Sequence, residues 1–194
     1  MFQHPVNPQI LAILIQTNMN SKPNIKLIQG DILNQEVEAI VNATNKLLSG
    51  KGGVASAIRK AAGKELEKHC LKLIPLNVGE AKITPGYNLP VPWIIHTHGP
   101  LWIDGISGIK EEQLLQQCYR NSLALMQEYN IKSIAFPGIA TGVHGFPKDK
   151  AAQIAVNAAM DFLSQDNDEK TIIFVCWTDF EYSCYENVLQ EILR

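Results

Sequence analysis

The stretch GDILNQEVEAIVNATNKLLSGKGGVASAIRKAAG, from Gly30 to Gly63, decides how the rest of the chain is interpreted. It holds a short apolar run over residues 39–43, an asparagine-rich loop, a glycine cluster and then apolar residues at helical spacing. A strand that leads through glycines into a helix forms a generic anion site, because the first N–H groups of a helix have no partner inside it. Gly52 and Gly53 also let a phosphate approach the backbone closely.

Several blocks of the sequence resemble those of macrodomains, the modules that bind ADP-ribose. The match is carried by QGDI and VNATNKLLSGKGGVASAI and is extended by GEAKITPGYNLP, WIIHTHGP and SIAFPGIATGVHGFP. Blocks that follow one another in the right order are more specific than a single glycine motif. The resemblance implies one macrodomain over residues 25–194, folded as a three-layer α/β/α sandwich with a central mixed sheet.

Composition fits one globular domain. The chain has 194 residues, of which 46% are hydrophobic and 19% charged, and its net charge is -2. That charge argues against broad binding to nucleic acid or membrane surfaces, which requires a basic excess. The four cysteines form no CxxC pair, so we expect reduced thiols and a cytoplasmic location.

Residues 1–24 lie outside the strongest match, and we expect them to form an N-terminal extension or an additional element at the sheet edge. Their run ILAILI is too short to span a bilayer. No Lys or Arg precedes it, so it is also a poor secretory signal.

From residue 24 onward, predicted strands and helices alternate, which favours a sheet with helices on both faces. We expect strands at 25–29, 39–43, 81–84, 93–97, 133–136 and 171–176. We expect helices at 54–73, with a break at Gly63, and at 111–129, 148–163 and 182–193. Ligands of such folds bind at the carboxyl ends of the strands.

Asp31 follows the first predicted strand. By position alone, an aspartate there is more often a turn or helix cap. The resemblance implies that Asp31 accepts a hydrogen bond from the adenine amino group, and that the backbone N–H of Ile32 contacts the ring. At the other end of the chain, it implies that Trp177 stacks on adenine, with Phe180 as the alternative.

Two asparagines close the second predicted strand. An asparagine after a strand is usually a structural amide, and we expect this role for Asn42. The resemblance assigns Asn45 to the distal ribose, where it helps to place a water near the anomeric carbon. Asn45 is therefore the predicted catalytic residue.

The glycine cluster has a competing interpretation as a dinucleotide-binding fingerprint, since Gly50, Gly52 and Ala55 satisfy GxGxxA. The long gap after the strand and the missing acidic residue argue against it, and no P-loop motif is present. We expect Gly52, Gly53 and Val54 to bind the diphosphate. In this cluster Lys51 replaces a common family glycine, and Ala55 takes the place of the aspartate that MacroD-type hydrolases use in water activation.

A second glycine-rich loop follows the fifth predicted strand. We expect its N–H groups to enclose the diphosphate from the opposite side, with glycines that allow conformations other residues resist. The resemblance implies that His144, often Tyr or Phe in the family, packs on the distal ribose. Phe146 is either core or pocket wall. The residues expected to bind ligand here are Gly138, Ile139, Ala140, Thr141, Gly142, Val143, His144 and Phe146.

His96 and His98 lie two apart on a predicted strand and could, with His69 and Cys70, suggest a zinc site. The resemblance favours packing roles for them, and we expect no metal and no other cofactor.

Three functions remain open on this sequence. The favoured one is slow, metal-free hydrolysis of ADP-ribosyl conjugates, either mono-ADP-ribosylated protein or O-acetyl-ADP-ribose. The second is a non-catalytic reader of ADP-ribose or ADP-ribosylated protein, which is compatible with the lack of a carboxylate at Ala55. The third, a phosphatase acting on ADP-ribose 1″-phosphate, would use the same pocket.

Overall fold

The computed structural model describes residues 24–50, 52–165 and 169–192. Its centre is a six-stranded sheet with the strand order β1-β6-β5-β2-β4-β3. All neighbouring strands pair in parallel except β3, which is antiparallel to β4 at one edge, so the sheet is mixed as expected. The strands are β1 (Asn24–Gln29), β2 (Ala39–Ala43), β3 (Ala81–Pro85), β4 (Trp93–Thr97), β5 (Ser133–Phe136) and β6 (Thr171–Cys176).

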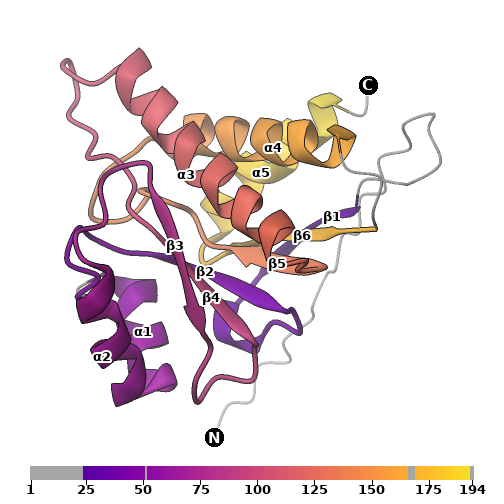
Figure 1. Cartoon of the computed structure of the whole chain (residues 1–194). Helices are drawn as coiled ribbons and strands as arrows, with labels where there is room; N and C mark the ends of the chain where they lie inside the picture. The colour runs from indigo at the N-terminus through magenta and orange to yellow at the C-terminus, as the bar shows by residue number, and fades with distance from the viewer. Residues whose placement is uncertain (1–23, 51, 166–168, 193–194) are drawn as a thin grey trace, which may run out of the picture.

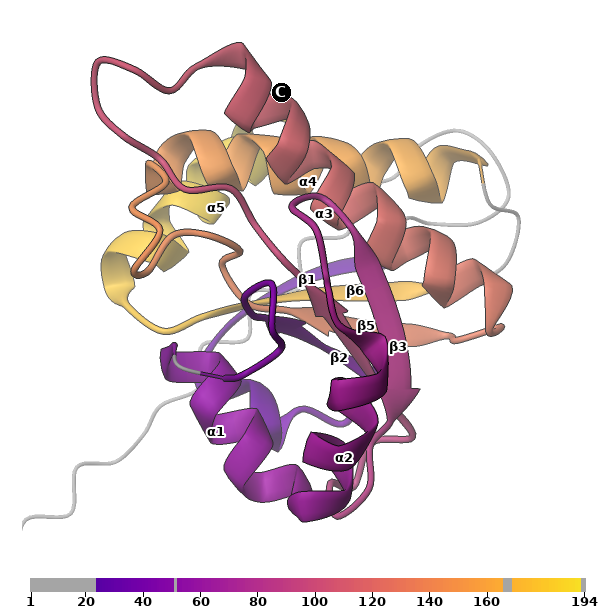
Figure 2. The ribbon, with the colours of Figure 1, turned by 60° about the vertical axis from the view of Figure 1, so that its left-hand side comes forward.

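Helices cover both faces of this sheet. Figure 1 shows α1 and α2 on one face and α3, α4 and α5 on the other, and the turned view in Figure 2 shows the same three layers. The predicted α/β/α sandwich is therefore confirmed. The helices are α1 (Gly53–Ala62), α2 (Lys64–Leu73), α3 (Ile109–Glu128), α4 (Lys148–Gln165) and α5 (Asp179–Ile192), with a short 3-10 helix, η1 (Ile32–Asn34), after β1.

Each face of the sheet has its own hydrophobic core. One core joins β-strand residues to α3, α4 and α5, and includes Phe136, Phe174 and Tyr185. The other joins the opposite face to α1 and α2, and includes Ile40, Ile58 and Leu66. Strands that are buried on both faces read as continuous apolar runs, which is why AIVNA and TIIFVC were recognisable as strands.

The predicted helix over 54–73 breaks at Gly63, as expected. Gly63 has φ +86°, a conformation that favours glycine, and it separates α1 from α2. The predicted N-terminal element falls on residues 1–23, outside the described residues, and β1 begins at Asn24. No helix in the described ranges combines the length and apolar character needed to cross a bilayer.

Parallel pairing brings the carboxyl ends of five strands to one edge of the sheet. In spatial order, the residues that follow these ends are Asp31 after β1, Trp177 after β6, Gly138 after β5, Asn45 after β2 and Gly99 after β4. Segments far apart in the sequence therefore meet along one line, which is where ligands of open α/β sheets bind.

Candidate functional site

A cavity of about 780 Å³ lies along this edge of the sheet. Its walls come from the turns after five strands, from the start of α1 and from the first turns of α4 and α5. The lining residues are Gly30, Asp31, Ile32, Ala43, Thr44, Asn45, Gly52, Gly53, Val54, Ala57, Gly99, Pro137, Gly138, Ala140, Thr141, Gly142, Val143, His144, Lys148, Val175, Trp177, Thr178 and Glu181. Most residues predicted from the sequence to bind ligand are among them.

Asp31 performs the structural role that its position suggested, while also lining the cavity. Its Oδ1 accepts a hydrogen bond of 2.9 Å from the N–H of Leu33 and thereby caps η1. This bond fixes the carboxylate at the rim and leaves Oδ2 for another donor. Ile32, which is buried, lines the cavity beside it. The adenine contact of Asp31 remains a prediction.

The start of α1 has the features of an anion site. Gly52 is the N-cap and has no side chain to satisfy the first N–H groups of the helix. A Cβ built on Gly52 or Gly53 would meet no atom within 4 Å, so open space faces both residues. Ala55 is buried and brings no carboxylate to this wall. Lys51 lies outside the described residues.

The second loop offers a row of main-chain donors. Among the described residues, the N–H groups from Thr141 to His144 donate to no other protein group. They belong to a turn closed by hydrogen bonds from Gly145 N to Gly142 O and from Phe146 N to Ala140 O. The loop therefore presents free donors across the cavity from α1, as expected of a diphosphate clamp.

The expected reason for the glycines in this loop was partly wrong. Gly145 has φ +67°, but Gly138 and Gly142 do not adopt positive φ, whereas Ala140 does at +64°. Gly138 is required for space, because a Cβ there would lie 2.0 Å from Oε1 of Glu181. Gly142 faces open space within the cavity.

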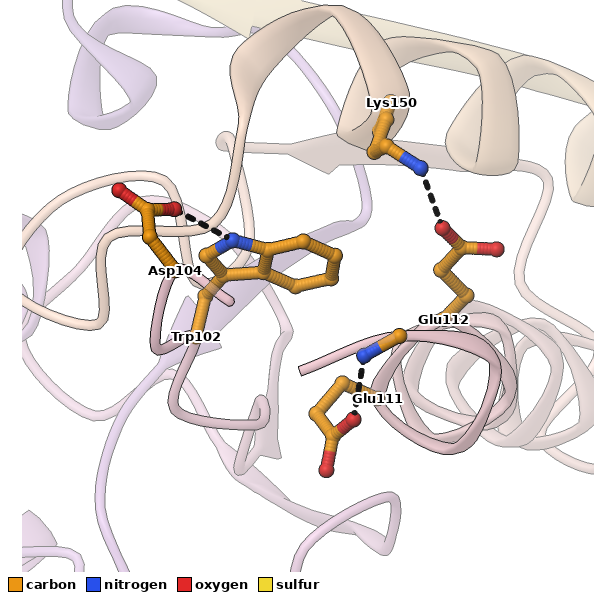
Figure 3. A network of polar contacts seen from close by, with 6 residues as sticks. Trp102, Asp104, Glu111, Glu112 and Lys150 are labelled. Carbon is orange, nitrogen blue, oxygen red and sulfur yellow. Dashed lines mark hydrogen bonds and ion pairs between the residues drawn. The ribbon is translucent and has the colours of Figure 1, made fainter. Parts of the chain in front are cut away.

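Two predicted ligand residues of this loop do not line the cavity. Ile139 is fully buried in the core, and Phe146, at 2% exposure, packs on the Trp102 ring with centroids 4.7 Å apart. Of the two alternatives for Phe146, the structure favours core. Trp102 is held in turn by a hydrogen bond to Asp104, and Lys150 lies over its ring while pairing with Glu112 (Figure 3).

The amide of Asn45 turns onto its own loop. Its Oδ1 accepts from the N–H of Leu47 and from the N–H and Oγ of Ser49, while Nδ2 donates to Ser49 Oγ at 2.8 Å. The residue still lines the cavity, so it shapes the loop and faces the ligand space at once. Asn42 has the structural role expected of it, with its Nδ2 3.0 Å from Nδ1 of buried His96.

The structure distinguishes the two aromatic candidates after β6. Trp177 lines the cavity, with 73% of its surface exposed and free to stack. Phe180 is also exposed but is not part of the cavity wall, and Lys148 Nζ lies 5.8 Å from its ring centroid. Trp177 is therefore the better candidate for stacking on a base.

Sequence reasoning missed four polar lining residues, Thr44, Lys148, Thr178 and Glu181, and the glycines Gly30 and Gly99. Glu181 is buried, and its Oε2 accepts from the N–H of Trp177 at 3.0 Å while Oε1 accepts from Thr141 Oγ1 at 3.4 Å. It therefore ties the second loop to the Trp177 turn. Its spacing of four residues from Trp177 was the available signal, but it required placing the start of α5 correctly.

The three histidines considered for a zinc site, His69, His96 and His98, have packing roles. Burial lowers the pKa of His96 to about 3, so the ring is neutral between Asn42 and Thr84. Burial also lowers the pKa of His98, whose Nδ1 donates to Leu76 O. His69 hydrogen-bonds to Tyr87. In the described ranges, no group of three or more His, Cys, Asp or Glu side chains is arranged to hold a metal ion.

Comparison with known proteins agrees with this geometry. The Macro domain family model matches residues 41–155. The O-acetyl-ADP-ribose deacetylase of Escherichia fergusonii is 44% identical over 174 residues, covering 88% of this chain and 97% of that protein. The ADP-ribose glycohydrolase MACROD2 of Homo sapiens is 41% identical over 177 residues, covering 91% of this chain and 41% of the human protein.

Solved structures match as well. The Oceanobacillus iheyensis macrodomain with ADP has a TM-score of 0.84 and 38% identity, and the match covers 95% of this chain and 98% of that one.

Proposed function

Because this chain belongs to the macrodomain family, we propose that it binds ADP-ribose and slowly hydrolyses ADP-ribosyl conjugates, either mono-ADP-ribosylated protein or O-acetyl-ADP-ribose. One observation carries the proposal: two rows of unpaired main-chain donors face each other across one cavity. They are the N–H groups at the start of α1 and those from Thr141 to His144. Such donors suit a diphosphate, whose charge helix dipoles and backbone amides stabilise without a basic surface.

The two ends of the cavity match the two ends of this ligand. Asp31 offers a carboxylate oxygen and Trp177 an exposed ring at the β1 and β6 end, which together suit the edge and face of adenine. Thr44, Asn45 and His144 surround the β2 and β4 end, where the distal ribose and its conjugated group would lie. The ligand then spans the strand ends from one edge of the sheet to the other.

The hydrolytic step depends on positioning of a water, because Ala55 offers no carboxylate base at the start of α1. Asn45 is the residue proposed to place the water, and its fixed amide is consistent with an ordered loop at that point. Slow turnover is the expected consequence of this arrangement.

Incubation with a mono-ADP-ribosylated protein tests the proposal, with release of ADP-ribose as the readout. Wild type should release ADP-ribose, and Asn45→Ala should slow the release by about tenfold or more. Ser49→Ala is the matched control, because it removes the Oγ contacts of the loop and leaves the amide of Asn45 in place, with its bonds from the N–H groups of Leu47 and Ser49. Equal losses in both variants would show that Asn45 acts only by holding the loop.

A second candidate function is a non-catalytic reader, favoured by the engagement of the Asn45 amide within its own loop. Binding of ADP-ribose by a wild type that releases none from protein, and none from O-acetyl-ADP-ribose, would establish the reader. Release of phosphate from ADP-ribose 1″-phosphate would instead support phosphatase action in the same cavity. We also propose a cytoplasmic location, which is supported by four unpaired and buried cysteines.

A further inference from the structure

The imidazole of His144 has a defined orientation and a defined tautomer. Its Nδ1 lies 2.9 Å from the backbone oxygen of Gly99. A carbonyl oxygen can only accept, so Nδ1 carries the hydrogen, and in the neutral ring Nε2 keeps its lone pair. His144 lines the cavity and is only partly buried, which leaves Nε2 as the ring atom available to accept a proton there.

The anchor of His144 also sets its position along the cavity. Gly99 follows β4, and β4 lies beyond β2 in the sheet, away from the β1 and β6 end that holds Asp31 and Trp177. Thr44 is held to the same strand end by the bond from its N–H to Thr97 O. A ligand with its base at Asp31 and its diphosphate between the two donor rows therefore has its distal sugar beside His144.

Among the described residues, His144 is the one titratable side chain that lines the β2 and β4 end of the cavity, the distal end. The other titratable side chains of the cavity wall are Asp31, Lys148 and Glu181. Asp31 follows β1, Glu181 accepts from the N–H of Trp177, and Lys148 lies beside Thr178 and Phe180. All three therefore lie at the β1 and β6 end of the cavity, called the base end because the adenine base would bind there.

We propose that His144 is the general base of the hydrolysis, a role that rests on the function proposed above. Nε2 accepts a proton from the attacking water while the water oxygen bonds to the anomeric carbon of the distal ribose. The bond from that carbon to the conjugated oxygen breaks, and its electron pair leaves with the carboxylate of a modified Asp or Glu side chain. The imidazolium then releases its proton to solvent.

This chemistry suits a leaving group that needs no proton. A carboxylate leaves with its electron pair and needs no proton, because its conjugate acid has a pKa of only about 4. An alkoxide or amine leaving group would need a general acid at the distal end, and the described residues place no carboxyl group there.

A second imidazole packs against the ring of His144. It belongs to His98, directly after β4, and the two ring centroids lie 5.9 Å apart. Burial lowers the pKa of His98, so that ring stays neutral and sets no charge beside His144 at neutral pH.

The test compares wild type with His144→Phe and His144→Gln on a glutamate-linked mono-ADP-ribosylated protein. We expect kcat to fall by about a hundredfold in both variants. Phenylalanine keeps a ring against the ribose, so the Kd for ADP-ribose in the Phe variant should stay within about threefold of wild type. His69→Phe removes an imidazole that bonds to Tyr87 outside the cavity and should leave kcat unchanged.

Three results would contradict the proposal, and they differ in what else they overturn. If His144→Phe keeps kcat within about threefold of wild type, His144 is not the base, and the proposed hydrolase stands. If the variant loses affinity and keeps kcat, His144 is a binding contact. If wild type releases no ADP-ribose, both the proposed hydrolase activity and the role of His144 as its general base are wrong.

Discussion

The two ends of the cavity are built by different means. At the β1 and β6 end, two carboxylates organise the backbone, since Asp31 accepts from Leu33 N and Glu181 accepts from Trp177 N. At the β2 and β4 end, the lining side chains are those of Thr44, Asn45 and His144, and none is a carboxylate. Negative charge is thus placed where an amino-bearing base would bind, away from the distal sugar.

This difference suggests a division of work. Carboxylates and an exposed ring recognise an adenine by its edge and face, while a neutral end with one imidazole suits proton transfer. Between the ends lies the clamp of main-chain donors, whose charge comes from dipoles rather than side chains. Substitutions at the base end should therefore change affinity, and substitutions at the distal end should change turnover.

The largest effect should come from blocking the clamp between the two ends. In Gly142→Glu the new side chain extends into the cavity and places a carboxylate beside the diphosphate. We expect the Kd for ADP-ribose, measured by calorimetry, to rise by more than about a thousandfold. The Tm should not change, because a Cβ at this position meets no atom within 4 Å.

Gly142→Ala is the matched control for this variant and should bind nearly as well as wild type, since it adds one methyl group and no charge. Retention of micromolar affinity by Gly142→Glu would contradict the clamp. The two ends of the cavity could then no longer be assigned to one ligand.

A smaller effect should follow from removing the exposed ring at the base end. Stacking of a base on an aromatic side chain contributes about 1–3 kcal/mol. We therefore expect Trp177→Ala to weaken ADP-ribose binding by about thirtyfold. The kcat at saturating substrate should stay unchanged, because this ring lies far along the cavity from His144.

Phe180→Ala provides the comparison for that measurement. Phe180 is similarly exposed but lies outside the cavity wall, so its removal should change affinity little. A larger loss in Phe180→Ala than in Trp177→Ala would reverse the assignment of the stacking ring.

The sheet was predictable from the sequence because burial on two faces imposes a pattern on strands. The runs 39–43, 93–97, 133–136 and 171–176 have the same bounds in the structure as in the prediction. Helix ends were less well predicted, since α5 begins at Asp179, three residues before the expected start. Its first turn carries Asp179 and Glu181, acidic residues that favour a helix start but contribute nothing to hydrophobic periodicity.

The site was predictable as far as motifs fix the backbone, and less so for individual side chains. Gly52, Gly53 and the second loop line the cavity because they belong to glycine-rich turns that follow strand ends. The directions of Ile139 and Phe146 were not predictable, because an irregular loop has no repeat that separates core from cavity. The hydrogen bonds from His144 Nδ1 to Gly99 O and from Trp177 N to Glu181 Oε2 do not follow from spacing alone. The first joins residues 45 positions apart, and the second depends on where α5 begins.

The smallest expected effect is also the sharpest test of the base end. Asp31→Asn keeps an oxygen that can cap Leu33 N, but it can place an amide donor where adenine presents its own amino group. We expect ADP-ribose affinity to fall by about tenfold, the size expected for one charge-assisted hydrogen bond, while kcat at saturation is kept. The hypoxanthine analogue, which presents an acceptor at the same place, should bind the variant better than ADP-ribose does, because the new amide can donate to it. Titration of both ligands into both proteins measures this reversal, and an unchanged preference for adenine would remove Asp31 from base recognition and leave it only the capping of η1.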